Sequence, residues 1–218
     1  MDKNILIYVL GYVSAFGTLV PFLFAIFRYK YLKSEHKWLL LLFGLGSLTE
    51  LVSRIYANIV SPNNVWLFNI YQILETTIII IFYSMLTQVK LKKRLLYLFI
   101  ILFTIVSVYQ ISNIGYARLN DLSFSIESII VVLLTILNFH SILKKQVYTN
   151  ILNAPIFWIN SGFLIFYFGN LFLHIFSKYL QAHAINAFFE LWVFHSIFNI
   201  ILYILISIGF WKTKKSQI

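Results

Sequence analysis

The sequence has little of several residue types that soluble proteins use freely. It contains no cysteine, only three prolines and eight glycines, and just 11% of its 218 residues are charged. Without cysteine, disulfides, iron–sulfur clusters and thiol catalysis are excluded. Because a soluble domain carries about a quarter charged residues, this low share, with a mean hydropathy of +0.86, indicates a membrane protein.

The apolar residues fall into seven segments, each long enough to cross a bilayer core, which takes roughly 20 helical residues. We therefore expect an all-α integral membrane protein, a single domain of seven transmembrane helices in one bundle. The first segment lacks a clear cleavage site, so we expect it to stay as a helix rather than act as a signal peptide. The expected spans are 5–27, 38–60, 65–87, 95–112, 122–141, 155–176 and 186–210.

The positive charges predict how the bundle is oriented. Thirteen of the 17 Lys and Arg residues form four clusters that all fall on one side of the predicted membrane. Cytoplasmic loops carry such an excess, so we expect the N-terminus outside and the C-terminus in the cytoplasm. The expected neighbours of these loops are anionic lipid headgroups, and nucleic acid is not an expected partner despite the net charge of +10. The clusters are Arg28, Lys30, Lys33 and Lys37; Lys90, Lys92, Lys93 and Arg94; Lys144 and Lys145; and Lys212, Lys214 and Lys215.

Four of the seven acidic residues lie inside predicted spans: Glu50, Glu75, Glu127 and Glu190. An ionisable group in hydrocarbon costs at least ~2.5 kcal/mol, so such residues usually face a bundle interior or water. Glu50 and Arg54 are four residues apart in the order that favours a helical ion pair. That pair either neutralises itself and fixes packing, or it binds a charged or zwitterionic ligand.

Five spans place their polar residues at similar depths, in the half of the bilayer predicted to be outermost. We expect a polar pocket there, open to the outside. The alternative is a set of unrelated interhelical hydrogen bonds, each worth well under ~2 kcal/mol. The expected ligand-binding residues are Glu50, Arg54, Gln72, Glu75, Asn170, His174, His195 and Asn199.

The last span divides its polar residues between two faces. At 100° per residue, Trp192, His195, Ser196 and Asn199 share one face, and Glu190 projects from the opposite side. We expect Glu190 to be interfacial, because a carboxylate in the first turn suits the helix dipole. The first and fourth spans have no charged residue in their interiors and are expected to face lipid.

Two segments near the C-terminus carry a family resemblance: FWINSGFLIFYFGNLFLHIFS (157–177) and LWVFHSIFNIILYILISIGFW (191–211). In them the chain resembles a group of seven-helix bacterial inner-membrane proteins that has no assigned activity. The resemblance extends over most of the chain and implies the same topology. It implies no particular reaction and no particular site residues.

Three functions fit these features. The preferred interpretation is binding of a small polar or zwitterionic ligand, or an ion, for sensing, regulation or transport, without a cofactor. A membrane-embedded metal-dependent hydrolase acting on a lipid is an alternative, with His174, His195 and Glu75 as metal ligands, although no HExxH spacing occurs. The third is an accessory membrane protein that regulates a separate effector, for example in a defence system, through a protein partner or as a homo-oligomer. Whether the protein is an enzyme stays open at this stage.

Overall fold

A computed structural model of the chain describes residues 3–86, 93–116, 118–145 and 150–213. Seven helical stretches in it are long and apolar enough to cross a membrane, which confirms the expected number of spans. The helices are α1 (Lys3–Gly17), α2 (Leu19–Phe27), α3 (Ser34–Ile59), α4 (Val65–Met85), α5 (Lys93–Ile114), α6 (Asp121–Lys145), α7 (Pro155–His183) and α8 (Ile185–Trp211), with short 3-10 turns at Tyr29–Tyr31 and Ile151–Asn153.

The first span is interrupted, where the sequence predicted one continuous helix. α1 ends at Gly17 and α2 begins two residues later. Pro21 has no N–H to donate to the Gly17 carbonyl four residues earlier, so the helical hydrogen bonding is broken here. The Thr18 side chain at the break lies 3.4 Å from the Phe43 carbonyl oxygen and 3.2 Å from the Ser47 hydroxyl. These contacts join the interrupted span to α3.

The helices also run past the predicted membrane boundaries. α7 continues to His183 rather than ending at residue 176, and Ala184 alone separates it from α8. The predicted span 155–176 is confirmed as an apolar stretch, Pro155–Phe176, and residues 177–183 of the connector continue the same helix beyond it. Hydropathy marks where the apolar stretch ends, but residues 177–183 contain no proline or glycine to end the helix.

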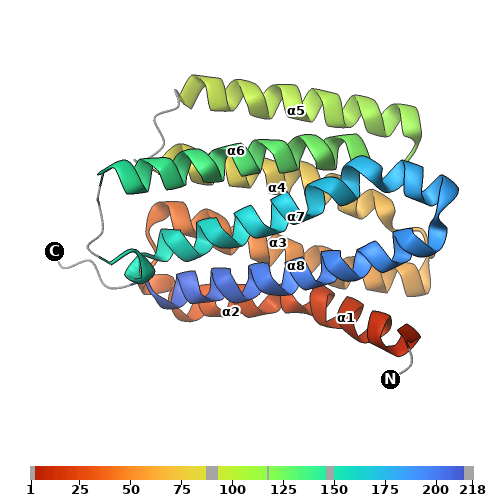
Figure 1. The fold of residues 1–218 in the computed structure, drawn as a ribbon, viewed down its shortest axis with the longest axis horizontal. Helices are drawn as coiled ribbons and strands as arrows, with labels where there is room; N and C mark the ends of the chain where they lie inside the picture. Colours follow the sequence, from red (N-terminus) through yellow and green to blue (C-terminus); the bar gives the residue numbers. More distant parts are fainter. Residues whose placement is uncertain (1–2, 87–92, 117, 146–149, 214–218) are drawn as a thin grey trace.

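Six of the seven spans form a closed ring, and the remaining one lies outside it. Around the ring α3 packs on α4, α4 on α6, α6 on α7, α7 on α8, and α8 on the interrupted α1–α2 span, which returns to α3. α5 packs against α4 and α6 and forms one edge of the molecule (Figure 1). The peripheral place of α5 agrees with the expectation for the fourth span. α1 and α2 close the ring but also leave large apolar side chains exposed, among them Val13, Val20 and Leu23, so the expectation that the first span faces lipid stays a prediction.

Close packing of α7 on α8 depends on small residues. A methyl group added at Gly169 would lie 2.6 Å from the Phe198 ring, and one at Gly209 would lie 2.6 Å from Ile159. Small residues let membrane helices approach in this way, which strengthens the dispersion contacts between them. These two glycines therefore allow α7 and α8 to pack closely along their length.

The two halves of the bundle differ in what fills them. The half where α3 begins and α8 ends holds a packed apolar core that includes Leu39, Phe82 and Phe210. Buried polar contacts there join three spans: the Tyr83 hydroxyl on α4 donates to the Asn160 side-chain oxygen on α7 at 2.6 Å, and the Asn160 side-chain nitrogen donates to the Thr135 carbonyl on α6 at 2.8 Å. The other half, where α3 ends and α4, α6 and α8 begin, contains a cavity.

Candidate functional site

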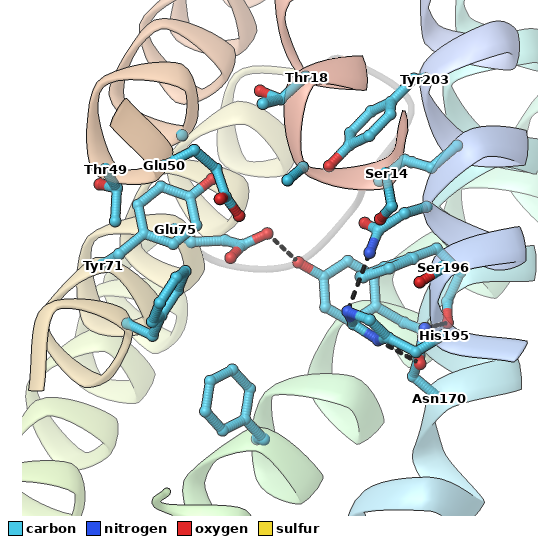
Figure 2. Close-up of a pocket in the computed structure, with 18 of the residues that line it drawn as sticks. Ser14, Thr18, Thr49, Glu50, Tyr71, Glu75, Asn170, His195, Ser196 and Tyr203 are labelled. Atoms are coloured by element: carbon cyan, nitrogen blue, oxygen red, sulfur yellow. Dashed lines mark hydrogen bonds between the residues drawn. The ribbon is translucent and has the colours of Figure 1, made fainter. Parts of the chain in front are cut away.

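A cavity of about 580 Å³ lies within the ring and is lined by residues of α1, α3, α4, α6, α7 and α8. This volume falls in the range of pockets that hold small organic ligands, roughly 300–1,000 Å³. Figure 2 shows the carboxyl groups of Glu50 and Glu75 directed into the same space, with the Tyr203 hydroxyl facing them. The polar lining residues are Ser14, Thr18, Thr49, Glu50, Arg54, Asn64, Tyr71, Glu75, Glu127, Ser128, Tyr167, Asn170, His174, His195, Ser196, Asn199 and Tyr203.

The structure brings most of the expected ligand-binding residues to this one cavity. Those that line it are Glu50, Arg54, Glu75, Asn170, His174, His195 and Asn199. Gln72 is not among the lining residues that the structure describes: its side chain is fully buried and lies beside Glu127. The side chain of Glu190, which was expected to be interfacial, lies outside the described part of the structure.

Three helices meet at one tyrosine hydroxyl in the cavity lining. The Tyr167 hydroxyl on α7 lies 2.8 Å from Glu75 Oε1 on α4 and 3.5 Å from Glu127 Oε1 on α6. A hydroxyl has one hydrogen to donate, and the shorter contact identifies Glu75 as its acceptor. Glu127 is only 1% exposed. We call Glu75, Glu127 and Tyr167 the carboxyl cluster.

The carboxyl cluster has an unfavourable charge arrangement if both acids are ionised. Their Oε1 atoms contact the same hydroxyl, so the two contacts together limit the separation of these atoms to about 6 Å. Two negative charges that far apart repel by roughly 3 kcal/mol at an effective dielectric constant of 20. A proton or a bound cation would remove this repulsion.

The positive side chain nearest this site is already engaged. Arg54 is the one Arg or Lys in the described cavity lining, and its Nε lies 4.0 Å from Glu50 Oε2. Its guanidinium also lies 4.7 Å from the ring centre of Tyr12 and 4.8 Å from that of Phe16, both on α1. Arg54 thus balances Glu50, which leaves the carboxyl cluster without a matching positive side chain in that lining.

His195 is held by two asparagines, one on each ring nitrogen. Asn170 donates through its side-chain nitrogen to the Phe166 carbonyl at 2.8 Å, which leaves its side-chain oxygen to accept from His195 Nδ1 at 2.7 Å. Asn199 donates to His195 Nε2 at 2.9 Å, and Figure 2 shows His195 beside Asn170. Donation from Nδ1 and acceptance at Nε2 together define a neutral imidazole.

The arrangement of the histidines also bears on the hydrolase hypothesis. Among the described residues, no three or more His, Asp or Glu side chains are placed to hold a metal ion. His174, His195 and Glu75 therefore do not form the metal centre expected for that alternative. The His174 ring instead stacks on Phe124, with ring centres 5.0 Å apart, and both His195 nitrogens are hydrogen-bonded.

Two tyrosines of the cavity were missed from the sequence. Tyr71 and Tyr203 both line it (Figure 2), and the Tyr71 hydroxyl packs closely enough that a methyl group added at Gly46 would lie 2.9 Å from it. A signal was available, since Tyr71 precedes Glu75 by four residues and Tyr203 follows Asn199 by four. Each tyrosine thus extends an inward-facing polar stripe by one helical turn.

Comparison of the chain with protein-family models, with curated proteins and with solved structures found no match in any of the three. The similarity noted for residues 157–177 and 191–211 therefore stays a prediction from the sequence. Any function must be argued from the cavity itself.

Proposed function

We propose that this chain is a multi-pass protein of the bacterial inner membrane whose cavity binds a small zwitterionic molecule, for sensing, regulation or transport. The observation that carries the proposal is the carboxyl cluster, two acids on one tyrosine hydroxyl in a cavity large enough for an organic ligand. A positively charged ligand group placed there would relieve the repulsion between Glu75 and Glu127.

The aromatic lining favours an organic ammonium group over a small metal ion. A cation within about 6 Å of an aromatic ring centre gains roughly 0.5–2 kcal/mol, and quaternary ammonium ligands are recognised in this way. A substituted ammonium group also loses less hydration free energy than a metal ion when it moves from water into a cavity lined by apolar side chains. The aromatic lining residues are Phe43, Phe68, Tyr71, Phe124, Phe163, Phe166, Tyr167, Trp192 and Tyr203.

Arg54 supports a negative group at the other end of the ligand. Its planar guanidinium matches a carboxylate or phosphate with two parallel hydrogen bonds. The 4.0 Å separation from Glu50 is longer than a hydrogen bond, so a ligand carboxylate can approach Arg54 without breaking a tight pair. A molecule with separated positive and negative groups therefore fits better than a simple cation.

Titration calorimetry on the purified protein tests this proposal, with glycine betaine, choline and acetate as probes. We expect betaine and choline to bind and acetate not to bind. Glu75→Gln should weaken both about tenfold or more, and Arg54→Gln should weaken betaine while leaving choline unchanged. Glu35→Gln at the opposite end of α3 and Arg94→Gln on α5, outside the cavity lining, serve as matched controls.

Two results would contradict the proposal. If neither betaine nor choline binds, the cavity has no site for an ammonium group. Equal losses in the cavity variants and in their controls would mean that the substitutions act through general charge rather than through this cavity.

The orientation of the bundle is part of the proposal. The positive-inside pattern supports an extracytoplasmic N-terminus, with the cavity in the outer half of the bilayer and anionic headgroups beside the basic loops. In keeping with this, Arg28 after α2, Lys144 in the last turn of α6 and Lys212 after α8 fall at the bundle end away from the cavity. A reporter fused to the C-terminus should be active only in the cytoplasm; extracytoplasmic activity would reverse the assignment.

A further inference from the structure

We infer that the cavity exchanges one proton for one bound organic cation: Glu127 holds the proton when the cavity is empty and loses it when an ammonium group binds beside Glu75 and Tyr167. This inference rests on the proposed function and adds its coupling to protons.

The hydrogen bonding of the cluster assigns the proton to one acid. The Tyr167 hydrogen is directed to Glu75 at 2.8 Å, a contact that favours the ionised form of Glu75, and the Tyr167 oxygen keeps lone pairs free. Glu127, 3.5 Å from the same oxygen, can direct its own proton there. Being 1% exposed, Glu127 also has less solvent than the half-buried Glu75 to support a charge.

The groups facing the cluster from the other helices do not supply a positive charge. α3 brings Glu50, paired with Arg54. α8 brings His195, which the two asparagines hold as a neutral ring. The remaining titratable groups facing the cavity are Tyr71 on α4, His174 on α7 and Tyr203 on α8. When Glu127 is protonated, the cluster carries one negative charge, on Glu75. A bound cation offsets the repulsion between the two carboxylates, so Glu127 can then ionise as well.

A buried amide beside Glu127 is placed to support its ionised form. Gln72 is fully buried and its side chain lies within hydrogen-bonding range of Glu127, and among the described residues neither of its polar atoms is paired elsewhere. A protonated Glu127 needs only one acceptor, which Tyr167 offers. An ionised Glu127 needs donors, and the Gln72 amide nitrogen carries two hydrogens.

The exchange balances in atoms and charge. The O–H bond of the Glu127 carboxyl breaks, the proton leaves to water through the cavity, and the ammonium group of the ligand takes its place as the positive charge beside two carboxylates. No oxidant or co-reactant is involved. Because binding releases one proton, the affinity for the cation must rise with pH. The rise is up to tenfold per pH unit over the range in which Glu127 is protonated in the empty cavity.

The test is choline calorimetry on the full-length protein in two buffers of different ionisation enthalpy, which gives the number of protons released per choline bound. We expect about one proton from the wild type and from Glu35→Gln. Glu127→Gln, which keeps a neutral side chain of the same shape, should still bind choline and should release none. Infrared spectra of the empty protein should contain a protonated-carboxyl band that disappears in Glu127→Gln and persists in Glu75→Gln.

The outcomes separate the two claims. Choline binding without proton release, or release that persists in Glu127→Gln, overturns the exchange and leaves the proposed ligand site standing. Failure of choline alone overturns the exchange, whereas failure of both choline and betaine overturns the proposed function and the exchange with it. Loss of the infrared band in Glu75→Gln instead of Glu127→Gln overturns the assignment of the proton.

Discussion

Replacing Tyr167 with Phe removes the single hydroxyl on which α4, α6 and α7 converge, while keeping the ring and its packing. The hydroxyl lies 2.8 Å from Glu75 Oε1 and 3.5 Å from Glu127 Oε1. We expect Tyr167→Phe to lower both the free energy of unfolding and the affinity for choline, because Glu75 loses its donor and the two carboxyl groups lose the oxygen between them.

The size of the stability loss follows from two competing estimates. A hydrogen bond to a charged group contributes about 1.5–3 kcal/mol in soluble proteins, whereas interhelical bonds in membranes average ~0.6 kcal/mol and reach ~1.7. Glu75 borders the cavity and can be partly hydrated after the substitution, so the lower range applies. We expect a loss of about 1 kcal/mol in unfolding free energy, and the same loss expressed in binding would be about fivefold in affinity.

Unfolding in mixed detergent micelles, followed by tryptophan fluorescence, measures the stability change. Tyr97→Phe is the matched control, because it removes a hydroxyl from an exposed position on α5. A double-mutant cycle with Glu75→Gln then isolates the contact, and we expect a coupling free energy near 1 kcal/mol. If Tyr167→Phe matches Tyr97→Phe in both stability and choline affinity, or if the coupling is zero, the carboxyl cluster does not act as a unit.

Three further predictions concern packing and metal content. Gly169→Ala should lower the free energy of unfolding by about 1–3 kcal/mol, because the added methyl group would lie 2.6 Å from the Phe198 ring on α8. Gly11→Ala is the control and should be neutral or slightly stabilising, because its methyl group meets nothing within 4 Å. Equal effects of the two substitutions on unfolding in detergent would contradict the close α7–α8 packing. Tyr83→Phe should cost about 0.6–1.7 kcal/mol by leaving the Asn160 oxygen unpaired, measured against the same α5 control, and no loss would mean that the pair is not formed. Mass spectrometry of the purified protein should find well below one zinc per chain; a ratio near one would favour the hydrolase.

The spans could be predicted from the sequence because the bilayer itself imposes them. Any helix that crosses hydrocarbon must show a long apolar stretch, and the described part of the chain has seven helical stretches long and apolar enough to do so. Helix ends are under no such constraint, which is why the extension of α7 to His183 was missed. The break at Thr18 could have been predicted from Pro21, since proline always removes one helical donor.

The candidate site could be predicted only in part, for a geometric reason. Helical phase and depth place Glu50, Glu75 and His195 at one level of the bundle interior, and the structure puts all three on one cavity. Phase does not say which inward faces meet. Glu75 and Glu127 contact the same Tyr167 hydroxyl because α4, α6 and α7 are neighbours around the ring. Helical periodicity in a single sequence does not predict which helices are neighbours.

The filled half of the bundle bears on the choice between sensing and transport. A transporter must open its cavity to each side of the membrane in turn, yet here the half beyond the carboxyl cluster is closed by buried Ile79, Phe82 and Phe163 and by the Tyr83–Asn160 pair. Opening it would separate α4 from α7 and leave buried polar groups unpaired, which is costly in hydrocarbon. A cavity that this filled half closes on one side is better suited to binding a ligand as a signal than to passing it across the membrane. We therefore expect saturable choline binding without choline uptake into vesicles that contain the protein, and accumulation of choline would show that the filled half opens.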